Sequence, residues 1–300
     1  MAYRIFIIAA LSCLAFIQAG AQVTFPPGTS LCDTGAWQMI WHDEFDGPAL
    51  DTSKWYTWTP SWNPETNRQD TFARTAYTRS GGGVLYLDSN VQVSEGTCKL
   101  TARYQPTQWI TENDNGGRDT VRKDHISGLI HTWNRSFGPG RFEIRCRLPE
   151  AKKDVHATFW TWGDANHNEI DIFEWYGKKH KNTSVVHAWP KEGERHDGSI
   201  YRFNAAGWHT YTCDWDQNFI RVYIDGALKY TARRYRGKYR DDCRPKEGKT
   251  FELNPAWLDD RETSQLIVSL DADRKKKIPP GETRVMEIDY IRVYQRINNK

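Results

Sequence analysis

The chain has 300 residues, of which 38% are hydrophobic and 26% charged, and this composition excludes a disordered or collagen-like protein. The 41 basic and 38 acidic side chains give a formal net charge of +3, which is too balanced for a protein whose main partner is duplex nucleic acid. The aromatic content is unusual, because 14 Trp, 14 Tyr and 12 Phe exceed what a core normally requires. Some of these rings are therefore expected at the surface for a functional reason.

The first 21 residues have the pattern of a secretory signal peptide. Arg4 supplies a positive charge, residues 5–17 are apolar, and residues 19–21 are small enough for cleavage. The apolar run is too short for a comfortable transmembrane helix of about 20 residues, and no later segment is apolar enough to span a bilayer. An alternative, a lipoprotein anchor at Cys13, would leave a very short signal. We therefore expect a signal peptide at residues 1–21 and a secreted or periplasmic protein without a membrane span.

Five cysteines follow the expected cleavage site: Cys32, Cys98, Cys146, Cys213 and Cys243. An oxidising compartment would allow up to two disulfides and leave at least one thiol. Neither a CxxC pair nor a Cys/His spacing typical of zinc is present. Cys146 and Cys213 stand in alternating apolar segments, which favours small buried hydrophobes. The pairing itself stays open.

Short alternating runs separated by turn residues follow one another along the chain, and long amphipathic helices are absent. No Pro- or Ser-rich linker divides the chain, so residues 22–300 are expected to form one domain. The pattern predicts an all-β protein, a sandwich or a barrel. The predicted strands are residues 38–45, 84–87, 99–104, 126–133, 140–148, 157–162, 169–175, 184–189, 209–215, 220–224, 265–270 and 286–294.

Three acids stand close together in the predicted strand at residues 169–175. Side chains two apart on a strand share a face, so Glu169 and Asp171 point the same way. Glu174 is out of phase, and a regular strand would bury it among apolar side chains, where an unpaired carboxylate is expensive. A β-bulge at Ile172-Phe173 would return Glu174 to the face of the other two acids, and bulges recur beside active sites. The sequence thus predicts three carboxyl groups on one surface.

Such a cluster suits retaining glycoside hydrolysis, which needs two carboxyl groups roughly 5 to 5.5 Å apart, one as nucleophile and one as acid then base. Asp171 lies between the two glutamates, and mutual repulsion would keep one or more protons in the cluster near neutral pH. Two alternatives remain open from the residues alone. They are a solvated acidic strand edge and a calcium site, because clustered carboxylates also suit hard cations.

The segment EIDIFE at residues 169–174 resembles the ExDxxE signature of glycoside hydrolase family 16, in the form that carries the bulge. Asn168 stands where the family commonly has Gly, and the family's upstream Trp-Pro pair is missing. Other landmarks occur in the family's order over essentially the whole mature chain: WHDEF at 41–45, LDTSKW at 50–55, Ser127-Gly128, GRFEIR at 140–145, TFW at 158–160, His187, Trp215, residues 220–226 and IDYIRVY at 288–294.

The resemblance implies a jelly-roll β-sandwich of two curved antiparallel sheets, concanavalin A-like, with a concave sugar-binding cleft. It implies that Glu169 is the nucleophile, Glu174 the acid/base and Asp171 an assisting acid. It places Asp289 where some members hold a structural calcium, with a surface carboxylate as the alternative. No other cofactor is expected.

Aromatic side chains should supply the sugar subsites, because Trp faces stack on pyranose rings. The resemblance places Trp160 and His187 in the cleft, and a core position is the alternative for each. Four more tryptophans are plausible companions with the same alternative: Trp133, Trp162, Trp175 and Trp189.

The resemblance implies a retaining endo-β-glycosidase that hydrolyses a polysaccharide by double displacement, with a β-1,3 or mixed β-1,3/1,4-glucan as the leading substrate. An agar, porphyran or carrageenan-type galactan is the alternative, favoured by the missing Trp-Pro pair and by two basic stretches, residues 178–181 and 233–249, if they overhang the cleft. Solvated loops are the competing explanation for these stretches. A transglycosylase and a catalytically silent carbohydrate-binding domain are further alternatives, and all three acids argue against the latter. The expected partner is a polysaccharide, with no nucleic acid, and the protein is expected to be a monomer.

Overall fold

The computed structural model describes residues 22–27, 29–32, 35–57, 59–63, 68–73, 84–112, 118–132, 134–163, 168–189, 193–240, 243–258, 263–273 and 276–297. The signal peptide expected at residues 1–21 and the subsite candidate Trp133 lie outside these ranges. Within them, no helix is long and apolar enough to cross a membrane.

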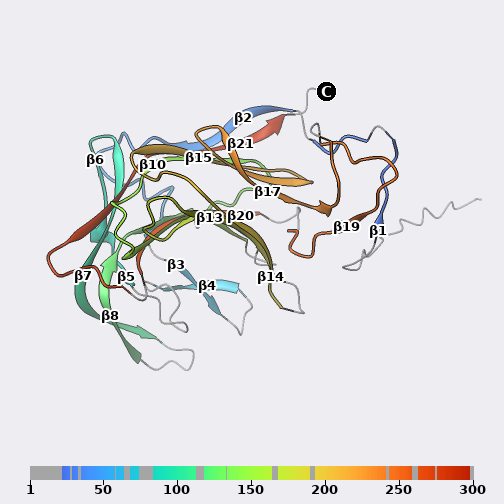
Figure 1. The fold of residues 1–300 in the computed structure, drawn as a ribbon. Helices are drawn as coiled ribbons and strands as arrows, with labels where there is room; N and C mark the ends of the chain where they lie inside the picture. Colours follow the sequence, from blue (N-terminus) through green and yellow to red (C-terminus); the bar gives the residue numbers. More distant parts are fainter. Residues whose placement is uncertain are drawn as a thin grey trace, which may run out of the picture.

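Two large sheets stack face to face as a β-sandwich, which confirms the predicted all-β class (Figure 1). The larger sheet has the order β17 (Ala227–Arg233), β16 (Phe219–Ile224), β15 (Trp208–Trp215), β10 (Arg141–Arg147), β21 (Thr283–Ile297), β7 (Thr97–Glu112), β8 (Arg118–Ser127) and β5 (Val84–Tyr86), with β2 (Ala36–Asp43) beside β21 and β6 (Val91–Ser94) beside β7. Its pairs are antiparallel except β5 with β8.

The smaller sheet is antiparallel throughout, in the order β14 (Arg195–Tyr201), β13 (Asn182–Ala188), β12 (Glu169–Trp175), β11 (Val155–Gly163), β20 (Ser264–Ala272) and β9 (Leu129–His131). The remaining elements are a sheet of β1 (Gln22–Val23), β19 (Phe251–Leu253) and β18 (Tyr235–Arg236), the hairpin of β3 (Thr59–Asn63) and β4 (Arg68–Ala73), and a 3-10 helix at Asp88–Asn90.

Each predicted strand segment overlaps an observed strand, and the main difference concerns residues 126–133. This segment is divided, because β8 ends at Ser127 and β9 begins at Leu129. Gly128 separates the two strands and passes so close to the chain that an added Cβ would lie 2.4 Å from the carbonyl oxygen of Asn90. The chain therefore changes sheets at a residue without a side chain.

The core fills the space between the two sheets, and alternation along the strands produces it. Phe142, Ile144 and Cys146 alternate with exposed or half-buried neighbours on β10 and are themselves fully buried. From the other sheet, the ring of Phe173 lies 4.4 Å, centroid to centroid, from that of Tyr211 on β15. One face of β12 is thus fixed against the larger sheet, and its other face is free to carry polar chemistry.

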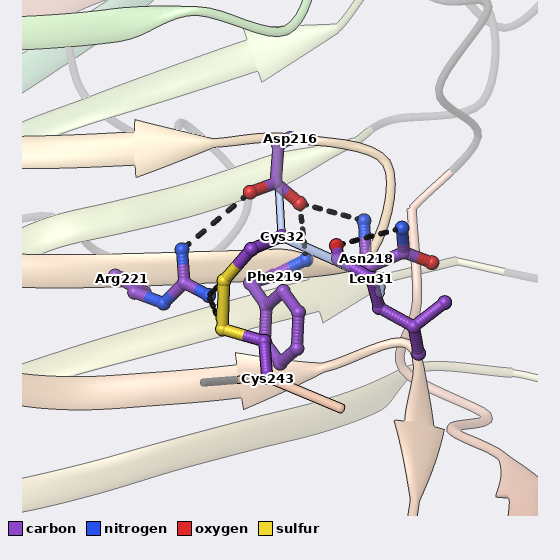
Figure 2. The surroundings of a disulfide bond; sticks show 7 residues. All are labelled: Leu31, Cys32, Asp216, Asn218, Phe219, Arg221 and Cys243. Atoms are coloured by element: carbon purple, nitrogen blue, oxygen red, sulfur yellow. Dashed lines mark hydrogen bonds and ion pairs between the residues drawn. A yellow bond between two sulfur atoms is a disulfide. The ribbon is translucent and has the colours of Figure 1, made fainter. Parts of the chain in front are cut away.

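A disulfide joins Cys32 to Cys243, which are 211 residues apart in the sequence (Figure 2). The guanidinium of Arg221 lies beside it, with Nη2 at 3.4 and 3.1 Å from the two sulfur atoms, and contacts Asp216 at 3.5 Å. Asp216 also accepts hydrogen bonds from two backbone N–H groups of the β15–β16 turn. Asn218, in that turn, donates from its amide to the carbonyl of Leu31. The segment before β2 is thereby tied to the larger sheet.

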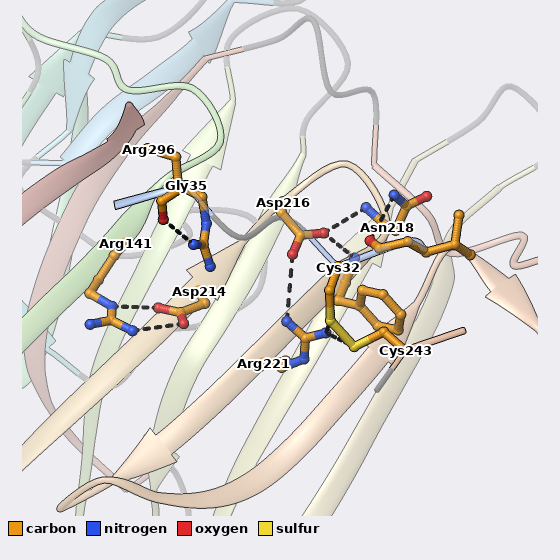
Figure 3. A network of polar contacts seen from close by, with 11 residues as sticks. Cys32, Gly35, Arg141, Asp214, Asp216, Asn218, Arg221, Cys243 and Arg296 are labelled. Carbon is orange, nitrogen blue, oxygen red and sulfur yellow. Dashed lines mark hydrogen bonds and ion pairs between the residues drawn. A yellow bond between two sulfur atoms is a disulfide. The ribbon is translucent and has the colours of Figure 1, made fainter. Parts of the chain in front are cut away.

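This polar network continues along the outer face of the larger sheet (Figure 3). Arg141 makes a two-pronged ion pair with Asp214, at 2.6 and 2.8 Å, and Arg296 donates to the carbonyl of Gly35. Because Phe142 points into the core, its neighbour Arg141 points outward. The network therefore stabilises the larger sheet, and the three acids lie on the other sheet.

The other cysteines after the expected cleavage site, Cys98, Cys146 and Cys213, are free thiols and are fully buried. Burial raises the pKa of each thiol, so the thiols stay protonated. The predictions of at least one free thiol, and of buried positions for Cys146 and Cys213, are confirmed.

Candidate active site

The three acids lie on β12, in the interior of the smaller sheet, and the ladder with β11 shows how the strand is built. Phe159 pairs with Phe173, and the next residue, Trp160, pairs with Asp171. Ile172 is therefore an extra residue without a partner on β11. This register confirms the predicted β-bulge.

The ladder on the other side of β12 shows the same irregularity. Two residues separate Asp171 from Glu174 on β12, whereas the single residue Ser184 separates their partners on β13. The hydroxyl of Ser184 donates to the carbonyl of Ile172 at 2.7 Å. It thus supplies a partner to a backbone oxygen that the bulge removes from the regular ladder, and an unpartnered buried carbonyl would destabilise the strand.

The bulge sorts the side chains of β12 onto two faces. Ile170, Ile172, Phe173 and Trp175 are buried in the core. Glu169 and Glu174 are half-buried, and Asp171 is 6% exposed. We call the outward face that carries these three acids the acid face of the smaller sheet.

The acids of the acid face influence one another electrostatically. Burial, followed by the charge of Asp171, raises the pKa of Glu169 to about 8. Burial also raises the pKa of Asp171, against the opposing effect of His187. Burial acts in the same direction on Glu174, but contacts with His156 and Tyr176 outweigh it and hold the pKa of Glu174 below its ordinary value. The cluster therefore keeps protons near neutral pH, as the sequence predicts.

His187 lies where the resemblance places it, next to the acids. It is the cross-strand partner of Glu169, its Nε2 lies 3.1 Å from Oδ2 of Asp171, and its Nδ1 lies 2.6 Å from Oε1 of Glu194. Burial opposes its protonation, yet the contact with Asp171 and the other acids raises its pKa to about 9. A positively charged imidazole therefore stands between the carboxylates at neutral pH.

Three of the predicted tryptophans lie beside the acids. Trp160 pairs with Asp171 and Trp162 pairs with Glu169, and the two rings meet edge to face at 6.1 Å. Trp189 is 41% exposed, stacks on the ring of His187 at 6.3 Å and hydrogen-bonds Glu169. Partly exposed rings around a carboxylate can form a platform for a sugar ring.

The prediction that Trp175 contacts substrate is wrong. Its side chain is 0% exposed, and its indole N–H donates to the carbonyl of Lys178 at 2.9 Å. The bulge explains this position: because it turns Glu174 outward, it turns the following residue inward. Trp175 is therefore part of the core.

Asp289, the predicted calcium ligand, lies on β21 of the larger sheet and pairs with Arg145 at 2.5 Å. A cation at this carboxylate would compete with a guanidinium, and calcium there stays a prediction. Among the described residues, one group has ligand atoms that all lie within 4.8 Å of one another, namely Glu169, Asp171 and His187. Because Asp171 and His187 already lie at ion-pair distance, we interpret this group as part of the acid site.

Two residues beside Glu174, Tyr176 and His156, complete the site. Neither is among the site residues predicted from the sequence. Tyr176 donates from its hydroxyl to Oε1 of Glu174 at 2.7 Å, and Nε2 of His156 lies 3.2 Å from the same oxygen. A signal for His156 exists in the sequence. It stands four residues before Trp160 on β11, so strand alternation places both side chains on the acid face.

Of the basic stretch 233–249, Arg233 ends β17, the edge strand of the larger sheet, and Arg236 lies on β18. Arg233 and Arg236 line a cavity of about 220 Å³ together with Asp197 of β14, and Arg236 lies 3.9 Å from the Asp197 carboxylate. His196 is the partner of His187, so it shares the acid face, and Asp197 points to the opposite face. These two arginines are therefore placed away from the acid face.

A β-sandwich with three neighbouring acids on one bulged strand, flanked by partly exposed tryptophans, is an arrangement suited to carbohydrate chemistry. The family model described as "Glycosyl hydrolases family 16" matches residues 83–265, more than half of the chain, and the chain belongs to this family.

Individual relatives agree with the family. The chain is 29% identical over 213 residues to a "Beta-glucanase" of Rhodothermus marinus, covering 65% of each protein. It is 26% identical over 281 residues to "Glucan endo-1,3-beta-glucosidase A1" of Niallia circulans, covering 86% of this chain and 38% of that protein. The chain thus spans less than two thirds of the length of either. The fold is similar to the laminarinase catalytic domain from Thermotoga maritima MSB8, with a TM-score of 0.62, 21% identity, and coverage of 87% and 99% of the two chains.

Proposed function

We propose that this protein is a retaining endo-β-glycosidase that hydrolyses a β-1,3 or mixed β-1,3/1,4-glucan by double displacement. The observation that carries the proposal is the bulged strand, which presents Glu169, Asp171 and Glu174 together on one face beside partly exposed tryptophans. The printed names of the two relatives, a beta-glucanase and a glucan endo-1,3-beta-glucosidase, support the substrate class.

In the first step, the carboxylate of Glu169 attacks the anomeric carbon, and the bond to the leaving oxygen breaks as Glu174 gives that oxygen a proton. In the second step, Glu174 takes a proton from water, and the resulting oxygen nucleophile displaces Glu169 from the anomeric carbon. Two inversions give net retention. Asp171, between the two glutamates, assists because its negative charge favours a protonated Glu174.

The protons must redistribute before the first step. The pKa of Glu169 is raised and that of Glu174 is lowered, whereas the reaction needs an ionised Glu169 and a protonated Glu174. Since the acids are coupled, the reactive form is the one in which Glu174 holds the proton and Glu169 is ionised. Protonated His187 favours that form, because its positive charge opposes the rise in the pKa of Glu169.

The tryptophans supply the surface on which the sugar rests. Trp162 and Trp189 both lie next to Glu169, and Trp160 lies next to Asp171. A pyranose ring stacked on these rings would have its anomeric carbon held near the nucleophile, and such positioning contributes strongly to rate.

We also propose that the protein is secreted or periplasmic and functions as a monomer. The sequence pattern of residues 1–21 supports export, and the disulfide between Cys32 and Cys243 suits an oxidising compartment. Amino-terminal sequencing of the exported protein tests the first point, with Gln22 as the expected first residue.

The experiment that tests the activity is incubation with laminarin, mixed-linkage glucan, agar, porphyran and κ-carrageenan, followed by sizing of the products. Shorter internal fragments from a glucan, released with the β configuration at the new reducing end, support the proposal. Cleavage of a galactan alone would contradict the substrate class. Longer products would indicate a transglycosylase, and unchanged chains a binding domain.

A further inference from the structure

His156 occupies a defined place beside one carboxylate of the acid face. Its imidazole ring is stacked on Tyr176, with centroids 4.1 Å apart and planes inclined by 6°. Its Nε2 lies 3.2 Å from Oε1 of Glu174, the oxygen that also accepts the Tyr176 hydroxyl. The stacking fixes the ring plane and keeps Nε2 at ion-pair distance from the Glu174 carboxylate. The nitrogen is not aligned for a hydrogen bond there, so proton exchange requires a small rotation of one of the two side chains.

A second carboxylate lies on the far side of the imidazole. Asp271, the cross-strand partner of His156 on β20, has its Oδ2 3.8 Å from Nδ1. The hydroxyl of Tyr86 donates to Oδ1 of Asp271, and the hydroxyl of Ser269 donates to Oδ2 at 3.3 Å. His156 therefore lies between two carboxylates, and that of Asp271 is fixed by hydrogen bonds from Tyr86 and Ser269.

We propose that His156 is a positioning residue for the reaction, an imidazole that shares the catalytic proton with Glu174 while Tyr176 and Asp271 hold it in place. The proposal rests on the proposed function, because the acid/base role of Glu174 is assigned there.

The proton balance of such sharing is simple. Before the first step, the proton on Nε2 moves to the Glu174 carboxyl, and from there to the leaving oxygen, which leaves His156 neutral and Glu174 ionised. In the second step the proton taken from water returns to Glu174 and then to Nε2. No outside acid is needed beyond the proton that the water supplies.

The charges around His156 favour a proton on the imidazole ring. Burial opposes the charge, but the nearby carboxylates outweigh burial and raise the pKa of His156. Among the described residues, the titratable groups that face it are Glu174 and Asp171 from β12, Tyr176 after that strand, and Asp271 from β20. All three charged neighbours are negative.

The sharing has a consequence for the pH profile of kcat/KM. A proton shared between two basic groups is lost at a higher pH than a proton bound to one group, because each added group stabilises the protonated form. Replacing the imidazole by an amide, His156→Gln, removes one of the two groups that can hold the proton. We expect the alkaline limb of kcat/KM to move to lower pH by about one unit, the lower end of the effect of a close charge.

His209→Gln is a matched control, because His209 is similarly buried and also contacts a carboxylate, Asp225, but lies on the larger sheet. It should leave the alkaline limb in place. A fall in rate at all pH values for His156→Gln, with the limb unmoved, would overturn the proposal, because a merely structural role predicts that result.

A titration of the histidine rings by NMR tests the proposal without activity. The His156 signal, assigned by its loss in His156→Gln, should titrate about one to three pH units lower in Glu174→Gln, because a charge within contact distance shifts a pKa by that amount. An unchanged titration would overturn the proposal whether or not any polysaccharide is cleaved. If the shift is found but no glycan is cleaved, the proton sharing stands and the proposed function fails.

Discussion

Nε2 of His187 lies 3.1 Å from Oδ2 of Asp171, and His187 is at the same time the cross-strand partner of Glu169. One imidazole therefore faces the middle acid and the proposed nucleophile together. Its charge offsets part of the repulsion that three acids on one strand would otherwise produce.

Replacing His187 by Gln should destabilise the protein in a pH-dependent way. The folded-state pKa of about 9 lies above the ordinary value of 6.5, so the contact stabilises the fold fully below pH 6.5 while Asp171 is ionised, and loses its effect as the pH rises through about 9. We expect a loss of about 2 kcal/mol in the free energy of unfolding near pH 6 and little loss near pH 10. Urea unfolding at both pH values measures it. An equal loss at the two would contradict the charge interaction.

Two tryptophans close to the acids should respond differently to replacement by Ala. Trp162→Ala should raise KM with a small loss of stability, because its ring is partly exposed beside Glu169. Trp175→Ala should cost about 3–5 kcal/mol of stability, because it leaves a large cavity in the core. Thermal unfolding and Michaelis kinetics on the same glucan compare the two. A greater loss of stability in Trp162→Ala would contradict the assignment of faces.

The spacing of the acids predicts β12 and its bulge because the alternative is so unfavourable. Glu169 and Glu174 are an odd number of residues apart, so the strand either buries a carboxylate or contains an inserted residue. Only the inserted residue has a small cost in free energy. The same reasoning, continued by one residue, places Trp175 in the core. Contrary to the prediction, Trp175 does not contact substrate, because the bulge shifts its direction together with that of Glu174.

Other features depend on contacts between distant segments and have no local signal. The partnership of Cys32 with Cys243 is one, since five cysteines allow many pairings. β14 is another, because an edge strand with mostly exposed or half-buried residues shows no apolar alternation. The contact of His156 with Asp271 joins two strands more than 100 residues apart, which only the fold brings together.

The bulge should depend on Ser184, whose hydroxyl reaches the carbonyl of Ile172. Ser184→Ala leaves this buried oxygen without that donor, and we expect a loss of about 1–3 kcal/mol in stability. Activity should fall as well, because the bulge sets the direction of Glu174. Ser199→Ala, at the paired position on β14, is the control. Unchanged melting temperature and rate in Ser184→Ala would show that the bulge holds without this bond.

The disulfide should stabilise the protein without affecting the chemistry. Removing it in the double variant Cys32→Ser, Cys243→Ser should cost about 2–4 kcal/mol, because the bond closes a long loop of the unfolded chain. The specific activity of the folded variant should match that of the parent, since the acids lie on the other sheet. Melting curves with and without reductant test this. A parent protein insensitive to reductant would contradict it, provided that thiol titration shows the bond reduced.

Azide rescue of the two Ala variants distinguishes the proposed roles of Glu169 as nucleophile and Glu174 as acid/base. On an aryl glycoside with a good leaving group, azide should restore part of the activity of Glu169→Ala and give a glycosyl azide of inverted configuration, because the small anion enters the space of the missing nucleophile. Glu174→Ala should instead give the azide of retained configuration, formed from the glycosyl-enzyme. NMR of the anomeric proton distinguishes the products. A retained product from Glu169→Ala, with an inverted product from Glu174→Ala, would exchange the two roles and refute this assignment.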